Sequence, residues 1–152
     1  MTTVVDILNF ENPIFNAFVF WSTVLVLKML LMSILTAMQR FKTKTFANAE
    51  DTTTFKNLKP KFNDPDVERV RRAHRNDMEN IPAFITVAFF YMLTSPSAFF
   101  AINLFRIAAI GRIVHTIVYA IFPMQPTRAI AWFACYATTA YMGIQVLFFF
   151  LG

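Results

Sequence analysis

Four long apolar stretches dominate this 152-residue chain and limit what it can fold into. They cover residues 13–38, 81–93, 98–122 and 129–151. A helix needs about 20 apolar residues to cross the hydrocarbon core of a bilayer, and three of the four stretches meet that length. The stretch at 81–93 reaches it only if part of the charged run before it belongs to the same helix. We therefore predict an all-α integral membrane protein with four transmembrane helices.

The polar connections predict how these helices follow one another. Asn12-Pro13 and Asp64-Pro65-Asp66 are typical of helix starts, because proline is favoured in a first turn and acids suit the N-terminal end of the helix dipole. The later connections are short, so successive helices should be antiparallel neighbours in an up-down bundle. We expect a single domain over residues 1–152, with helices at about 13–41, 66–94, 98–122 and 127–151, a short tail at 1–12, and a polar loop at 42–65.

The basic residues are concentrated in one part of the chain. Ten of the fourteen Lys and Arg residues fall between Arg40 and Arg75, and none precedes Pro13 or follows Arg128. Cytoplasmic loops of membrane proteins carry this kind of excess. The loop at 42–65 is therefore predicted to face the cytosol, with both termini on the other side of the membrane. Topology explains the basicity, and we expect no nucleic-acid partner.

A charged run at 68–79 leads directly into the second apolar stretch. Ionisable groups at membrane depth are costly and are usually functional. Helical spacing places several of them together, because residues i, i+4, i+8 and i+11 share one face. That stripe and its neighbours comprise Glu68, Arg72, Asn76 and Glu79, with Arg75 beside them and Arg71 and His74 on an adjoining stripe.

The second half of the chain has cations without matching acids. No Asp or Glu follows Glu79, although Arg106, Arg112 and Arg128 lie in apolar sequence. Pairing of Glu79 with Arg112 or Arg72 is one interpretation, with a purely structural role. The surplus of arginines favours a bound anion instead, since guanidinium groups suit bidentate capture of carboxylates. We predict an anion pocket between the helices, open toward the cytosol, with a second polar stripe formed by Arg112, His115, Thr116 and Tyr119.

The lysine in the first apolar stretch, the single cysteine and the two histidines limit which kinds of site the chain can form. Lys28 interrupts the first apolar stretch and should pair with an acid from another helix, Glu79 being one possibility. Cys135 is the only cysteine, and we expect a small buried side chain there. The two histidines, His74 and His115, have neither a cysteine partner nor paired-histidine spacing, so no metal site is expected.

Several long motifs resemble one family. The string VERVRRAHRNDMENI at 67–81 is similar to the signature of the membrane-associated proteins in eicosanoid and glutathione metabolism, the MAPEG family. The match continues through residues 46–51, 111–119 and 125–129, with intact spacing from about Phe15 to the C-terminus. The pattern is nearest to the family's glutathione transferases, particularly insect-type forms, with its prostaglandin E synthases second.

The resemblance implies a homotrimer of four-helix subunits that binds glutathione between adjacent protomers. It implies conjugation of glutathione to lipophilic electrophiles, often with reduction of lipid hydroperoxides, and glutathione as co-substrate without a metal. It also implies contact with membrane lipids in the endoplasmic reticulum membrane, possible presence in the mitochondrial outer membrane, and an active site facing the cytosol. Glutathione offers two carboxylates to arginines and an ammonium to Glu79.

The resemblance also assigns residues. Arg128 matches the arginine that holds the thiolate, and Tyr119 can donate to the same sulfur, so these two form the implied catalytic pair. An adjacent cation lowers the pKa of a thiol from about 8.5. The implied glutathione-binding positions are Arg40, Arg71, Arg72, His74, Glu79, Tyr119 and Arg128, together with Arg75, Asn76, Arg112 and His115 from the prostaglandin synthase pattern.

Four positions distinguish the branches of the family. Ala129 and Trp132 stand where the prostaglandin synthases have serine and tyrosine, which favours a transferase. Arg75 instead matches the synthases. Thr52 occupies the place of a reactive cysteine in mammalian transferases, so activation by thiol reagents is not expected. A prostaglandin E synthase-type isomerase and a non-enzymatic lipid-binding membrane protein remain as alternatives.

Overall fold

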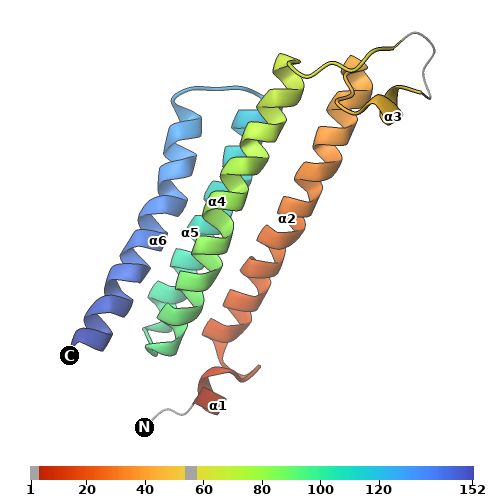
Figure 1. The fold of residues 1–152 in the computed structure, drawn as a ribbon. Coiled ribbons are helices and arrows are strands. Elements are labelled where there is room, and N and C mark those ends of the chain that lie inside the picture. The colour runs from red at the N-terminus through yellow and green to blue at the C-terminus, as the bar shows by residue number, and fades with distance from the viewer. Residues whose placement is uncertain (1–3, 54–57) are drawn as a thin grey trace.

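The computed structural model describes residues 4–53 and 58–152, and the regular elements in these ranges are all helices. Residues 54–57 of the predicted loop and residues 1–3 of the predicted domain lie outside the described residues. Successive long helices run in opposite directions, and both ends of the chain lie at the same end of the bundle (Figure 1). The predicted all-α up-down bundle is confirmed for these residues. The long helices are α2 (Pro13–Thr43), α4 (Pro65–Leu93), α5 (Ala98–Thr116) with its π-helical extension η1 (Ile117–Ile121), and α6 (Thr127–Leu151).

The predicted starts of the first two long helices are confirmed. Asn12 Oδ1 accepts a hydrogen bond from the Ile14 backbone N–H at 3.0 Å, and Pro13 occupies the first turn of α2. At the start of α4, Asp64 Oδ1 accepts from the backbone N–H groups of Asp66 and Val67 at 3.1 and 3.2 Å. A side-chain oxygen at this position satisfies N–H groups that have no partner inside the helix.

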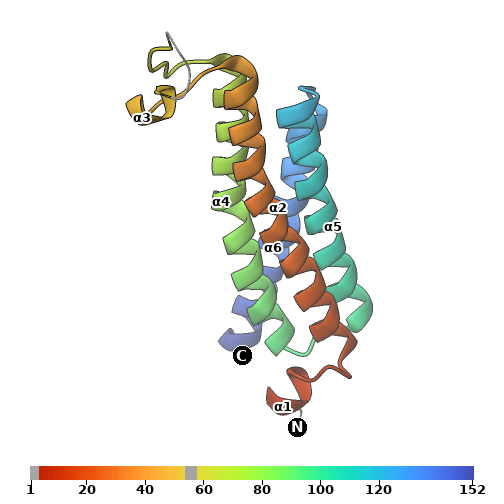
Figure 2. The ribbon, with the colours of Figure 1, turned by 90° about the vertical axis from the view of Figure 1, so that its right-hand side faces the viewer.

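Three of the described helical segments are long and apolar enough to cross a membrane: α2, α5 with η1, and α6. Helix α4 has 29 residues, about 43 Å of helix, but its first half is charged. It packs against both α2 and α6 and lies between them at the charged end of the bundle (Figures 1 and 2). That α4 also crosses the membrane stays a prediction.

The apolar core fills the half of the bundle away from the charged residues. Leu25, Ile81, Phe84 and Phe105 are fully or almost fully buried there, while large apolar side chains cover the outer faces of α2 and α6. Exposed apolar surface of this extent marks contact with a membrane or another protein. At the α5–α6 crossing, a Cβ atom on Gly111 would lie only 3.0 Å from the Ala131 carbonyl oxygen. The glycine is therefore what allows these two helices to approach closely.

Three local features add detail to the predicted element ranges. The predicted tail contains a short helix, α1 (Val4–Ile7), which packs on α4 and buries Ile7. The predicted loop contains another, α3 (Ala49–Thr52). The third long helix ends in the wider turn η1, where the Phe122 N–H donates to the Ile117 carbonyl five residues back at 2.8 Å. Pro123, which has no N–H to continue an α-helical ladder, directly follows this turn.

Candidate functional site

An ion cluster lies buried between three helices. Asp77 of α4 accepts from Arg112 of α5 and from Lys28 of α2, and both Asp77 and Arg112 are fully buried. Arg112 Nε lies 3.2 Å from Asp77 Oδ1, and Arg112 Nη2 donates to the same oxygen. The predicted ion pair of Lys28 is confirmed, with Asp77 as the acid. Pairing of Glu79 with Arg112 or with Arg72 is wrong, because Arg112 is held by Asp77 and no ion pair involves Glu79 in the described part of the chain.

This cluster carries two cations and one carboxylate, so it is positively charged as a whole. Three polar atoms near it are buried without a hydrogen-bond partner among residues 4–53 and 58–152: Arg112 Nη1, His115 Nδ1 and Thr116 Oγ1. Their residues lie at i, i+3 and i+4 and share one face of α5. A buried polar atom normally has a partner, so this face is suited to a polar ligand or to water.

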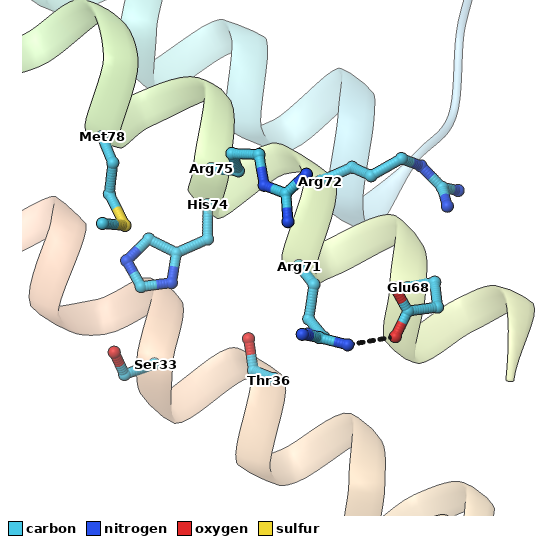
Figure 3. A pocket seen from close by; sticks show the side chains of 8 residues that line it. All are labelled: Ser33, Thr36, Glu68, Arg71, Arg72, His74, Arg75 and Met78. Atoms are coloured by element: carbon cyan, nitrogen blue, oxygen red, sulfur yellow. Dashed lines mark hydrogen bonds and ion pairs between the residues drawn. The ribbon is translucent and has the colours of Figure 1, made fainter. Parts of the chain in front are cut away.

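A cavity of about 650 Å³ lies between α2 and α4. Arg71 and His74 of α4 point toward α2, where Ser33 and Thr36 face them (Figure 3). Arg71 Nη1 also donates to Glu68 Oε1 at 2.6 Å. We call this space the arginine cavity. Four of the predicted glutathione contacts, Arg71, Arg72, His74 and Arg75, line it together with Ser33, Thr36, Glu68 and Met78.

A smaller cavity of about 180 Å³ adjoins the arginine cavity, because Glu68 and Arg71 line both. Arg40, near the end of α2, lines this second space. Helix α2 stops shortly afterwards at Lys44, whose φ of 51° is left-handed and ends the helix. The structure therefore places Arg40 of α2 in the same small cavity as Arg71 of α4.

A third cavity, of about 340 Å³, lies between α4, η1 and α6. The Arg128 guanidinium carbon is 4.4 Å from the centre of the Tyr119 ring, close enough for a cation–π contact. The His115 and Tyr119 ring centres are 5.4 Å apart. We call this space the Arg128 cavity. Four predicted residues, Asn76, His115, Tyr119 and Arg128, line it together with Gln125, Ala129 and Trp132.

Local backbone features position the Arg128 cavity. The η1 turn carries Tyr119, and such wide turns inside helices are frequent at functional sites. Arg128 is the second residue of α6, next to the turn that holds Gln125. Because a guanidinium only donates, the Gln125 amide oxygen faces it and accepts from Arg128 Nε at 3.1 Å. This hydrogen bond limits where the guanidinium can move.

Within a single chain, the predicted site residues are divided between two faces of α4. Asn76 lines the Arg128 cavity, whereas His74 and Arg75 line the arginine cavity. Arg112 lies buried beneath Asn76 and reaches it with Nη2 at 2.9 Å. Glu79 is exposed on α4 and lines neither cavity. Sequence reasoning missed Ser33, Thr36 and Gln125 as cavity-lining residues. Ser33 and Thr36 could have been found, because they are small polar residues three positions apart in an apolar helix.

Two further predictions concern the cysteine and metal binding. Cys135 is buried, as predicted, with its side chain in the α5–α6 region of the core. Within the described ranges, no group of three His, Cys, Asp or Glu side chains could hold a metal ion. The side chains that line the arginine cavity and the Arg128 cavity supply guanidinium, imidazole, carboxylate, hydroxyl, amide and phenol groups.

The fold and the cavities define a membrane-type helix bundle with three cation-lined spaces. Residues 18–148 match the MAPEG family model, and the chain belongs to the MAPEG family. It is 42% identical over 142 residues to microsomal glutathione S-transferase 1 of Mus musculus, covering 90% of this chain and 91% of that one. It is 41% identical over 141 residues to the Homo sapiens protein of the same name, with the same coverage. It is 38% identical over 137 residues to prostaglandin E synthase of Bos taurus, covering 90% of each chain.

Proposed function

We propose that this protein is a membrane-bound glutathione transferase that conjugates glutathione to lipophilic electrophiles and also reduces lipid hydroperoxides with glutathione. The observation that carries the proposal is the pair of cation-lined cavities, one with Arg71, Arg72 and Arg75 and the other with Arg128. Glutathione bears two carboxylates and a thiol, which are the groups that arginines bind and activate. Similarity to proteins named microsomal glutathione S-transferase 1 supports the same function.

In this proposal Arg128 and Tyr119 act on the sulfur. Arg128 stabilises the thiolate, and the Tyr119 hydroxyl donates a hydrogen bond to it. The thiolate then forms a bond to the electrophilic carbon, whose leaving group departs with the bonding electrons. A cation held in a fixed position beside the sulfur stabilises such charge. The surrounding apolar helices give lipophilic electrophiles a route from the membrane.

The remaining predicted contacts hold the rest of glutathione. Arg40, Arg71, Arg72 and Arg75 offer cations to its carboxylates, and His74 adds a further polar contact. Glu79, which is exposed and has no ion pair in the described residues, offers a carboxylate to the glutathione ammonium. Asn76 and His115 supply further polar groups to glutathione at the Arg128 cavity.

We infer that the complete site forms between copies of the chain, in a homotrimer. The supporting observation is that the arginine cavity and the Arg128 cavity lie on different faces of α4. A single glutathione can contact both sets only if the arginine cavity of one protomer meets the Arg128 cavity of its neighbour. The basic loop supports an endoplasmic reticulum membrane protein whose site faces the cytosol.

A prostaglandin E synthase-type isomerase is the second candidate. Arg75 and the similarity to prostaglandin E synthase favour it. Ala129 and Trp132, which line the Arg128 cavity, differ from the synthase pattern and favour the transferase. Both candidates use bound glutathione, so the electrophile or endoperoxide offered must distinguish them.

A panel of assays on the purified full-length protein in detergent tests the proposal. Glutathione is supplied with a chlorodinitrobenzene-type electrophile, with a lipid hydroperoxide, or with a prostaglandin endoperoxide. We expect conjugation and peroxide reduction. Turnover of the endoperoxide but of neither other substrate would identify the protein as an isomerase. A folded sample that binds glutathione but turns over none of the three would identify a binding protein instead.

A further inference from the structure

Asn76 connects the buried ion cluster to the Arg128 cavity. Its Oδ1 accepts from Arg112 Nη2 at 2.9 Å, and its side chain also lines the cavity. A guanidinium has only donors, so the atom that faces it must be the amide oxygen. The amide nitrogen of Asn76 therefore faces away from Arg112, and it has no acceptor in the part of the chain that the structure describes.

Lys28 determines how Arg112 can pair with Asp77. The Lys28 ammonium occupies Asp77 Oδ2, so both Nε and Nη2 of Arg112 are directed to Oδ1. A free carboxylate would offer both oxygens to the guanidinium fork. Because Oδ2 is taken, Nη2 stays between Asp77 Oδ1 and the amide oxygen of Asn76. Without Lys28, Arg112 could turn to use both carboxylate oxygens and release Asn76.

Burying this ion cluster costs desolvation free energy that apolar side chains would not cost. Replacing buried ion pairs by apolar side chains of similar volume is often neutral or stabilising, so packing alone does not explain two cations and a carboxylate. Specific orientation of a neighbouring group is a better account. Asn76 is the only residue of the Arg128 cavity to which the described hydrogen bonds connect this cluster.

We propose that Lys28, Asp77 and Arg112 are positioning residues that lock the Asn76 amide with its nitrogen toward the Arg128 cavity. There the Asn76 amide donates a hydrogen bond to an oxygen of the bound glutathione. This inference rests on the proposed function, because it takes glutathione as the ligand. It gives a role at the site to Lys28, which lines none of the three cavities described above.

The test is a double-mutant cycle between Lys28→Met and Asn76→Ala in the full-length protein. Equilibrium binding of glutathione is measured by calorimetry, and KM and kcat are measured separately. Each single variant should weaken glutathione binding about tenfold, or about 1.4 kcal/mol, and raise KM with little change in kcat. Once Asn76 is alanine, Lys28→Met should weaken binding no further, because both changes remove the same hydrogen bond.

Two variants serve as controls. Ser22→Ala alters another buried polar side chain of α2, outside the cluster, and should bind glutathione as the unaltered protein does. Lys28→Arg keeps a cation for Asp77 Oδ2 and should restore most of the affinity. If Lys28→Met does not fold, Arg112→Lys takes its place in the cycle. That change keeps the charge but removes the planar fork, and the same loss of affinity is expected.

The outcomes distinguish failure of the positioning role from failure of the proposed glutathione transferase function. Additive losses in the double variant would mean a merely structural cluster and would overturn the positioning role. Unchanged glutathione affinity in folded Lys28→Met or Arg112→Lys protein would also overturn the positioning role. Both results leave the proposed function intact, because the unaltered protein still binds glutathione. An unaltered protein that binds no glutathione would refute the proposed function and the positioning role with it.

Discussion

Replacing Arg128 by Leu should remove the main stabiliser of the glutathione thiolate. The Arg128 guanidinium is held by the Tyr119 ring at 4.4 Å and by Gln125 at 3.1 Å, so it has a defined place in its cavity. A unit charge about 4 Å from a thiolate is worth about 4 kcal/mol at an effective dielectric constant of about 20. Arg128 is only half-buried, and screening by solvent reduces this value to roughly 1.5–3 kcal/mol.

That energy translates into a measurable shift. At about 1.36 kcal/mol per pKa unit, the pKa of the bound thiol should rise by one to two units in the Arg128→Leu variant. Turnover near neutral pH should fall roughly tenfold to a hundredfold, and alkaline pH should restore part of it by deprotonating the thiol. Glutathione affinity should change less than turnover, because other arginines hold the carboxylates.

The assay is a titration of thiolate ultraviolet absorbance with glutathione bound, accompanied by pH profiles of kcat. Arg106→Leu is the matched control, since Arg106 is also an arginine in an apolar helix but is exposed and lines none of the three cavities. It should titrate as the unaltered protein does. An Arg128→Leu protein with an unchanged thiolate titration would show that another cation stabilises the sulfur.

Three other expected outcomes test separate parts of the structure. Arg72→Ala should raise the KM for glutathione severalfold with kcat nearly unchanged, and a loss confined to kcat would contradict its role as a binding residue. N-ethylmaleimide, removed before the assay, should not activate the enzyme, because Cys135 is the only cysteine and is buried, and Thr52 offers no thiol. A severalfold rise in turnover would refute this. Asp64→Ala should cost about 1 kcal/mol of stability in a thermal denaturation measurement, and an unchanged transition would show that the cap contributes little.

The Asp64 carboxylate also gives the protein a predictable response to acid. Burial would raise its pKa, but hydrogen bonds from the backbone of Val67 and Asp66 and the nearby Lys61 ammonium outweigh this, and the pKa lies below its ordinary value of 3.8. The folded state therefore binds this proton more weakly than the unfolded state does. The stabilisation is present above pH 4 and is lost as the pH falls through the lowered pKa. In thermal scans from pH 6 to pH 3, Asp64→Ala should lose less stability than the unaltered protein, and equal losses would contradict this assignment.

The helix starts could be predicted because their signals are local. Asn12-Pro13 and Asp64-Pro65 combine a side-chain acceptor with a proline that fits the first turn, and neither depends on distant residues. The π-helical turn at Ile117–Ile121 could not be predicted this way. Its hydrogen bonds reach one residue further than those of an α-helix, and the sequence before Pro123 also fits an ordinary helix end.

Helical periodicity could have identified Asp77, rather than Glu79, as the buried acid of α4. Asp77 and Glu79 are only two residues apart, but they lie about 200° apart around α4. Asp77 shares its face with Val70, Ala73 and Ile81, all of which are buried. An acid on that stripe must be buried and must therefore have a cationic partner. Which cations supply it depends on how α2 and α5 pack, and the sequence of α4 alone does not contain that information.

The charges that remain after these pairings explain why a dianionic ligand suits this bundle. The buried cluster keeps one positive charge in excess, and Arg71 is offset by Glu68. Arg72 and Arg75 have no ion pair in the described part of the chain, and Arg128 is held only by a ring and an amide. Arg72 and Arg75 are exposed, so their charges are open to an anionic ligand. Two carboxylates and a thiolate would complement these arginines at both cavities, which is why the cationic surplus visible in the sequence is better explained by a ligand than by internal salt bridges.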